Sequence, residues 1–115
     1  MLTLKAPRFY VGSYEGPSEI FSNYLDQGLV VNSTNWQRIL RGAADNNVWL
    51  VFGFAHLEGD FIYMAQAMID SNGEVVQIRH KLRPSGSERT MFSDGTTDML
   101  QVHQTECGRV GMLQC

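Results

Sequence analysis

The most regular hydrophobic pattern in the chain lies between residues 33 and 47, where apolar side chains recur at helical spacing. Ser33 or Thr34 can cap the start of such a helix, and Asn46 and Asn47 are natural terminators. We therefore predict a helix with one apolar face that packs against another element. The residues on that face are Trp36, Ile39, Leu40, Ala43 and Ala44.

Several segments after this helix have the pattern of β-strands. Residues 48–54 form a nearly continuous apolar run rich in β-favouring side chains, which predicts a strand buried on both faces. Residues 61–70 and 74–82 flank a Ser-Asn-Gly sequence, and Asn-Gly is a strong signal for a β-hairpin. A second hairpin is expected from residues 99–105 and 109–115.

Two stretches of the chain show no sustained period. The first thirty residues are punctuated by glycine and proline and are predicted to be loop with short elements. Residues 83–98 form a long polar loop, and loops of this length inside compact domains are usually functional or disordered. A helix followed by several strands indicates an α/β or α+β layered architecture. With 115 residues, the chain corresponds to one domain or to a piece of one.

Composition and charge narrow the classes of partner. Hydrophobic residues make up 43% of the sequence, which is enough for a globular core. The formal net charge of -3 gives no general attraction to nucleic acid or anionic lipid. No run approaches the ~20 apolar residues of a membrane span, and the N-terminus lacks the apolar core of a signal peptide. We therefore expect a cytoplasmic protein with no nucleic-acid partner and no membrane partner.

Four of the nine cationic side chains nevertheless lie within one short segment, residues 79–89. One explanation is a non-catalytic binding domain whose basic loop takes up phosphate or single-stranded nucleic acid. Such grooves combine cations with stacking aromatic rings, and Phe92 alone accompanies the cations here. The simpler expectation is a solvated, basic end of a strand, formed by Arg79, His80 and Arg83.

The cysteines and histidines give no sign of a disulfide or a metal site. Cys107 and Cys115 form no Cys-x-x-Cys pair, and on a turn followed by a strand they would lie roughly 25 Å apart. We therefore expect reduced thiols, with Cys107 as a turn residue without a role. The histidines are scattered singly, without the spacing of metal ligands. They are His56, His80 and His103.

Three residues have side chains that suit a common chemistry: Lys81, Glu88 and Cys115. A thiol becomes a strong nucleophile when a nearby cation or base favours the thiolate. A lysine can stabilise negative charge that develops on a substrate heteroatom, and a carboxylate beside it can orient the ammonium or share its proton. This set suits attack on an electrophilic carbon. By residue type alone, the alternative is a buried apolar cysteine and two solvated charges.

The order and spacing of the surrounding residues resemble signature segments of the nitrilase branch of the carbon-nitrogen hydrolase superfamily. The segments are RHKLRPSGSER at residues 79–89 and GRVGMLQC at residues 108–115, with an Asp-Gly turn at residues 94–95 between them. Weaker similarity extends back to the predicted helix, so the resemblance covers roughly residues 30–115 and leaves residues 1–29 unassigned. The resemblance implies an α/β fold, here an incomplete nitrilase-like αββα layered sandwich.

For the site, the resemblance implies a Glu-Lys-Cys triad with a second glutamate close by. Lys81 matches the family lysine, Glu88 the second glutamate and Cys115 the nucleophile. The family's first glutamate lies in a Phe-Pro-Glu segment, which this sequence lacks, and neither Glu15 nor Glu19 has that context. The Trp-Glu that normally follows the cysteine is also absent. We therefore expect this chain to be an incomplete piece of a nitrilase, cut at its nucleophile and inactive alone.

The activity that the resemblance implies for the complete enzyme is hydrolysis of a nitrile to a carboxylic acid and ammonia, through a cysteine thioimidate and thioester. The partner would be a small-molecule nitrile substrate, the enzyme would be a homo-oligomer, and no metal or organic cofactor would be needed. Cyanide hydratase and amidase of the same superfamily remain as alternatives. The RHKLRPSGSER and FSDGT segments look closest to nitrilases that act on organic nitriles, and the substrate itself is not defined.

Overall fold

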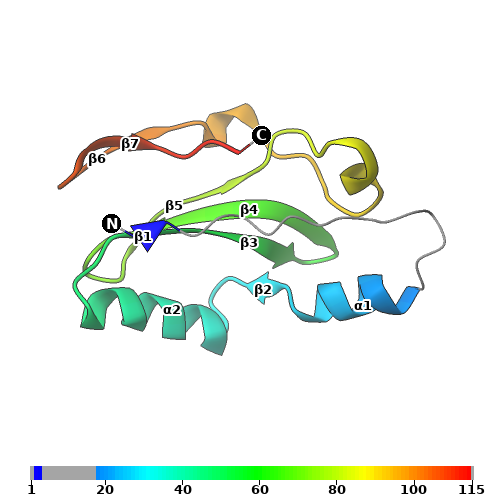
Figure 1. Cartoon of the computed structure of the whole chain (residues 1–115), viewed down its shortest axis with the longest axis horizontal. Helices are drawn as coiled ribbons and strands as arrows, with labels where there is room; N and C mark the ends of the chain where they lie inside the picture. The colour runs from blue at the N-terminus through cyan, green and yellow to red at the C-terminus, as the bar shows by residue number, and fades with distance from the viewer. Residues whose placement is uncertain (1, 4–17, 115) are drawn as a thin grey trace.

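The computed structural model describes residues 2–3 and 18–114 of the chain. Five strands form one sheet, and two more form a separate hairpin (Figure 1). The strands are β1 (Leu2–Thr3), β2 (Leu29–Val30), β3 (Leu50–Glu58), β4 (Phe61–Ile69), β5 (Val75–His80), β6 (Val102–Thr105) and β7 (Gly108–Gly111). The α-helices are α1 (Ser18–Asp26) and α2 (Thr34–Asp45), and the 3₁₀ helices are η1 (Gly86–Thr90) and η2 (Thr97–Met99).

The predicted helix is confirmed as α2. The hydroxyl of Ser33 accepts a hydrogen bond from the backbone N–H of Trp36 at 3.3 Å, which satisfies one of the free donors of the first turn. Asn46 forms the C-cap, and Asn47 adopts a positive φ of 51°, which ends the helix. Helix α1 was not predicted, because its nine residues lie in the stretch expected to be loop. This segment is preceded by Gly-Pro, and the stretch around it shows no sustained hydrophobic period, so the local signals favoured a loop.

The central strands extend beyond the predicted run of residues 48–54. β3 reaches Glu58 and pairs antiparallel with β4 along its whole length, and Gly59 turns the chain with a φ of 58°. The predicted hairpin of β4 and β5 is confirmed, and Gly73 at its turn has a φ of 80°. The carboxylate of Asp70 accepts hydrogen bonds from the backbone of Asn72 and Glu74 and so closes this turn. The predicted hairpin of β6 and β7 is also confirmed, with shorter strands than expected.

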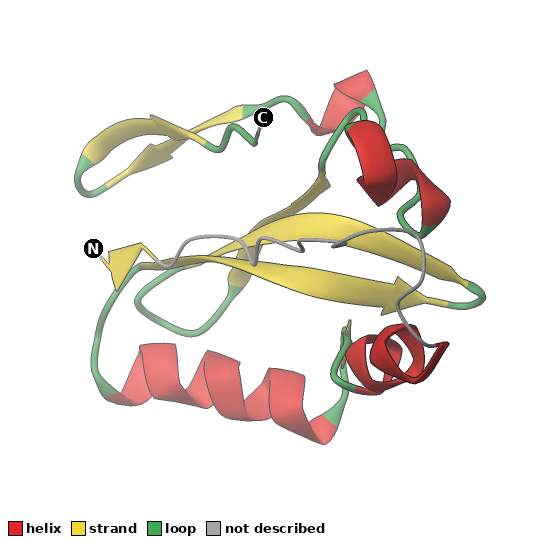
Figure 2. Ribbon diagram, turned by 45° about the vertical axis from the view of Figure 1, so that its right-hand side comes forward, coloured by secondary structure: helices red, strands yellow, loops and turns green. Residues whose placement is uncertain are grey.

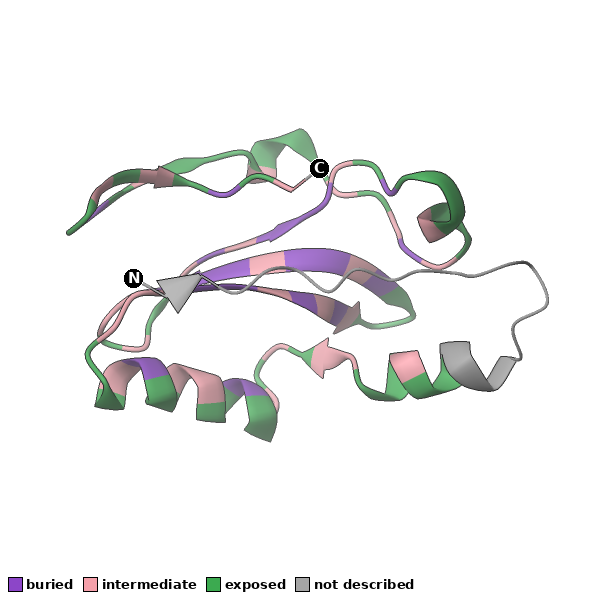
Figure 3. Ribbon diagram, viewed as in Figure 1, coloured by how far each residue is buried: buried purple, intermediate pink, exposed green. Residues whose placement is uncertain are grey.

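The sheet carries an apolar core on each face. Helices α1 and α2 lie on one side of it, and the β6–β7 hairpin lies on the other (Figures 1 and 2). Because side chains alternate along a strand, β3 and β4 supply both cores and are largely buried (Figure 3), as predicted for residues 48–54. The core toward α2 contains Trp36, Ala43, Phe52, Phe54, Ala65, Ala67 and Ile69. Two clusters on the other side contain Val51, Met68 and Met112, and Ile62, Met64 and Phe92.

The segment of residues 83–98 is more ordered than the predicted polar loop. It contains η1 and the start of η2, and its Phe92 is buried beside Ile62 and Met64. Its backbone is hydrogen-bonded to the sheet, since Ser93 N–H donates to the carbonyl of Ile62 at 2.9 Å. The layered α/β arrangement is therefore confirmed. None of the helices among the described residues is long and apolar enough to cross a membrane.

Candidate active site

Lys81 lies directly after β5, where the sheet meets the segment of η1. Its backbone N–H donates to the carbonyl of Met64 at 2.7 Å, and its own carbonyl accepts from the N–H of Gly95 at 2.9 Å. A Cβ atom at Gly95 would lie 2.8 Å from the carbonyl oxygens of both His80 and Lys81, so only glycine allows this approach. The backbone on both sides of Lys81 is thus fixed, and its side chain is 7% exposed.

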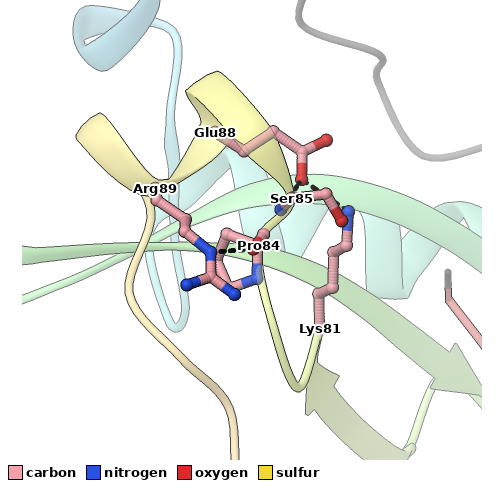
Figure 4. Close-up of polar contacts among 5 residues, drawn as sticks. All are labelled: Lys81, Pro84, Ser85, Glu88 and Arg89. Atoms are coloured by element: carbon pink, nitrogen blue, oxygen red, sulfur yellow. Dashed lines mark hydrogen bonds and ion pairs between the residues drawn. The ribbon is translucent and has the colours of Figure 1, made fainter.

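Glu88 meets Lys81 from the first turn of η1 (Figure 4). Glu88 Oε2 lies 2.5 Å from Lys81 Nζ and also accepts the backbone N–H of Ser85 at 2.7 Å. Burial alone would raise the pKa of Glu88, but the hydrogen bonds from Lys81 and Ser85 and the lysine charge outweigh it and lower this pKa. The Glu88 carboxyl is therefore ionised at neutral pH and holds the Lys81 ammonium in one position.

The short helix that carries Glu88 is anchored at both ends. Pro84, which precedes it, is fully buried, and its carbonyl accepts a hydrogen bond from Arg89 Nε at 2.9 Å (Figure 4). Phe92, which follows it, is buried against β4 and donates its backbone N–H to the Glu88 carbonyl at 2.8 Å. The position of Glu88 is therefore set by the loop as a whole as well as by its ion pair.

The structure brings two of the three predicted site residues together. Lys81 and Glu88 form the pair described above, and Cys115 lies outside the described residues. Met112, close before Cys115 in the sequence, is buried on the β6–β7 side of the sheet with Val51 and Met68. Cys107 is exposed in the turn between β6 and β7, as expected.

The prediction of a solvated strand end at Arg79 and His80 was wrong. Arg79 is 1% exposed and His80 is 5% exposed, whereas Arg83 extends into solvent and pairs there with Asp94. The reason is long-range packing. The β6–β7 hairpin and the segment after it cover one face of β5, and the core toward α2 lies against the other face. Arg79 donates to the backbone carbonyl of Met112 at 2.8 Å and to that of His80 at 3.1 Å.

A pair of buried histidines was not predicted. His56 Nδ1 and His80 Nε2 are 2.9 Å apart, and the ring of Tyr63 stacks on His80 at a centroid distance of 3.9 Å. Burial lowers the pKa of both rings, and for His80 it falls to about 4, helped by the charges of His56 and Arg79 and opposed by Glu58. Both histidines are therefore neutral at pH 7. The available signal was the place of His80 in the predicted strand of residues 74–82, whereas His56 lies just beyond the predicted run of residues 48–54. Among the described residues, no three His, Cys, Asp or Glu side chains are grouped as a metal site would require.

A hollow of about 450 Å³ lies between the end of α1, the turn from β3 to β4 and η1. It is lined by Leu25, Asp60, Phe61, Ile62, Thr90, Met91 and Ser93. Neither Lys81 nor Glu88 lines this hollow, so it is separate from the ion pair.

Comparison with known proteins identifies the family of this chain. The family model described as carbon-nitrogen hydrolase matches residues 8–115. The chain belongs to the carbon-nitrogen hydrolase family. A cyanide hydratase from Neurospora crassa is 36% identical over 104 residues, which are 90% of this chain and 30% of the relative. An arylacetonitrilase from Aspergillus oryzae is 37% identical over 98 residues, or 84% of this chain and 29% of the relative. These relatives confirm the predicted nitrilase branch, and the chain spans about 30% of their length.

Solved structures described as amidases share the fold of this chain. An amidase from Nesterenkonia sp. AN1 superposes with a TM-score of 0.66 at 20% identity, covering 95% of this chain and 42% of the amidase. A structure described as N-terminal amidase gives a TM-score of 0.60 at 10% identity, covering 88% of this chain and 24% of that protein. The predicted incomplete, nitrilase-like α/β fold is therefore confirmed. The roles of Lys81, Glu88 and Cys115 stay predictions.

Proposed function

We propose that these residues belong to an enzyme that hydrolyses nitriles, with Cys115 as nucleophile and Lys81 and Glu88 as its partners. The observation that carries the proposal is the buried ion pair of Lys81 and Glu88. A loop without a role in catalysis would leave its ammonium group in solvent, where the charge is hydrated. A site that stabilises charge on a reacting nitrogen or oxygen needs one that is fixed before the reaction begins.

In the proposed reaction, the Cys115 thiolate attacks the nitrile carbon, and the nitrile nitrogen takes up a proton to give a covalent thioimidate. A first water adds to the same carbon, and the carbon–nitrogen bond breaks to release ammonia and leave a thioester. A second water cleaves the thioester to the carboxylic acid and frees the thiol. Each step passes charge onto nitrogen or oxygen, which the Lys81 ammonium would stabilise. Glu88 would hold this ammonium and help move protons.

A second outcome, hydration to the amide, is favoured by the names of several relatives, which are cyanide hydratases. After the first water has added, the tetrahedral intermediate can expel either ammonia or the cysteine sulfur. Loss of ammonia gives the acid by way of the thioester, and loss of sulfur gives the amide directly. The same Lys81, Glu88 and Cys115 would serve both outcomes, so the choice depends on which leaving group is protonated.

The general base that activates water is a separate requirement. In the family pattern this role belongs to a glutamate in a Phe-Pro-Glu segment, and the 115-residue sequence contains no such segment. We therefore expect the 115-residue chain alone to turn over nitriles several orders of magnitude more slowly than a protein that supplies this glutamate.

The test uses a protein that contains these residues together with a Phe-Pro-Glu segment. It is incubated with phenylacetonitrile and, separately, with cyanide, and the ammonia, acid and amide formed are measured. The proposal predicts turnover that Cys115→Ala abolishes and that Cys107→Ala, in the exposed turn, leaves unchanged. Turnover that persists in Cys115→Ala, or no conversion of either substrate by the unaltered protein, would overturn it.

A further inference from the structure

Arg79 has an unusual environment for an arginine. It is 1% exposed and lies in β5, where its Cα pairs with that of Gln66 in β4. Of the residues that the structure describes, no carboxylate forms an ion pair with it. Its two hydrogen bonds go to backbone carbonyls, and its Nε has no partner. Burying a guanidinium without a carboxylate costs free energy of folding. The burial of Arg79 therefore indicates a role other than stabilising the fold.

The two carbonyls belong to distant parts of the chain. Arg79 Nη1 donates to the carbonyl of Met112 at 2.8 Å, and Nη2 donates to the carbonyl of His80 at 3.1 Å. His80 is the residue before Lys81, and Met112 is the third residue before Cys115. One planar guanidinium therefore connects the end of β5, just before Lys81, with the segment that leads to Cys115.

The neighbours of Arg79 on the same face of β5 make comparable connections. Gln77 donates to the carbonyl of Met99 at 2.6 Å and lies 3.0 Å from a ring nitrogen of His103. Lys81, two residues after Arg79, binds Glu88. The alternating residues Gln77, Arg79 and Lys81 thus contact three separate segments that cover this face, and Arg79 contacts the segment that leads to Cys115.

We propose that Arg79 is a positioning residue that fixes the segment leading to Cys115 against β5 through the backbone carbonyl of Met112. This inference rests on the proposed roles of Lys81 and Cys115. In the proposed site the Lys81 ammonium favours the Cys115 thiolate, and the Arg79 hydrogen bonds hold the segment that leads to Cys115 in place. Without them this segment loses its attachment to β5, and the proposed effect of Lys81 on the thiol should weaken.

The experiment measures alkylation of each cysteine by iodoacetamide against pH, with mass mapping of the modified peptides, in the full chain. Arg79→Gln should raise the apparent pKa of Cys115 and slow its alkylation at pH 7 about tenfold, because one pKa unit changes the thiolate fraction tenfold. Arg79→Lys can reach the Met112 carbonyl but cannot bridge it to His80, so it should restore part of the rate. Cys107 is exposed in its turn and is alkylated in the same sample, so it serves as an internal control. Its alkylation rate should not change.

The matched control is Arg83→Gln, which removes the same charge from an exposed position two residues after Lys81. It should leave the Cys115 profile unchanged. The inference would be overturned if Cys115 in Arg79→Gln showed the same pH dependence of alkylation as in the unaltered chain. It would also be overturned if Arg83→Gln shifted the apparent pKa of Cys115 as much as Arg79→Gln does. If Arg79→Gln does not fold, Arg79→Lys decides by the same measurement, and an unchanged Cys115 profile rejects the inference. The alkylation experiment uses no nitrile. Failure of the proposed function would therefore be seen separately, as absent turnover in the assay with phenylacetonitrile and cyanide.

Discussion

Lys81 and Glu88 are joined by an ion pair of 2.5 Å whose two side chains are only 7% and 19% exposed. The carboxylate has a second donor, the backbone N–H of Ser85, and the helix that carries it is fixed by Pro84 and Phe92. The second ion pair among the described residues, between Arg83 and Asp94, is exposed and has no such support. The two pairs lie close in sequence and differ in burial, so each is a control for the other.

Glu88→Gln should destabilise the chain by about 1–3 kcal/mol, because it leaves a buried ammonium without its carboxylate. Asp94→Asn breaks the exposed pair and should change the free energy of unfolding by less than about 1 kcal/mol. Urea unfolding of both variants beside the unaltered chain measures the difference. Equal effects of the two substitutions would contradict the distinction between the pairs.

The contribution of Glu88 should depend on pH in a defined window. Its pKa in the folded chain lies below the ordinary value of 4.5, so the ionised carboxylate stabilises the fold. This contribution is fully present above pH ~4.5 and is lost as the pH falls through the folded pKa. Melting temperatures from pH 3 to pH 7 should show a gap between the unaltered chain and Glu88→Gln that closes at the acid end. A gap that stays constant over this range would show that the Glu88 charge is not its source.

The His56–His80 pair should make the chain sensitive to mild acid. The pKa of His80 in the folded chain is about 4, below its ordinary 6.5, so the unfolded state binds the proton first as the pH falls. Stability should therefore decrease between pH 6.5 and pH 4, by up to about 3 kcal/mol from this ring. In His80→Gln this part of the dependence should disappear. A variant whose stability falls with the same slope over this range would rule out His80 as its cause.

Gly95→Ala should destabilise the fold at the residue that touches Lys81. The added Cβ would lie 2.8 Å from two backbone carbonyl oxygens, which cannot move as a side chain can. A loss of about 1–3 kcal/mol is expected from such overpacking. Gly42→Ala is the control, because nothing lies within 4 Å of its added Cβ in the middle of α2. There alanine should stabilise by about 0.5–1 kcal/mol. Thermal unfolding of both variants compares the two effects, and a stable Gly95→Ala would show that the close approach is not required.

The sequence predicted those elements whose signals are local. Helix α2 has a cap, a periodic apolar face and a terminator, and the β4–β5 hairpin has Asn72 and Gly73 at its turn. Helix α1 was missed because its stretch has no sustained period. The burial of Arg79 was also missed, because it depends on the β6–β7 side, which is more than twenty residues further along the chain. No local pattern distinguishes a buried arginine from a solvated one.

Of the candidate site, the pair of Lys81 and Glu88 was predicted from its motif, and the structure confirms that the two side chains meet. The chemistry of attack on an electrophilic carbon indicated which residue types to look for. The order of residues in the motif indicated which lysine and which glutamate they are. The contacts that hold Lys81 and Glu88 in place were not predicted. They are backbone contacts, such as those of Gly95 and Ser85, which leave no mark in the pattern of polar and apolar side chains.

The central claim is that the buried Lys81–Glu88 pair serves a covalent reaction of Cys115. The most direct measurement is the intact mass of a protein that contains these residues together with a Phe-Pro-Glu segment, taken after brief exposure to phenylacetonitrile and followed by mapping of the modified residue. The account predicts a substrate adduct on Cys115 whose rate of formation falls about 10²-fold or more in Lys81→Met and Glu88→Gln and is unchanged in Asp94→Asn. An adduct on Cys115 that forms equally fast in Lys81→Met and Glu88→Gln, or turnover without any Cys115 adduct, would contradict it.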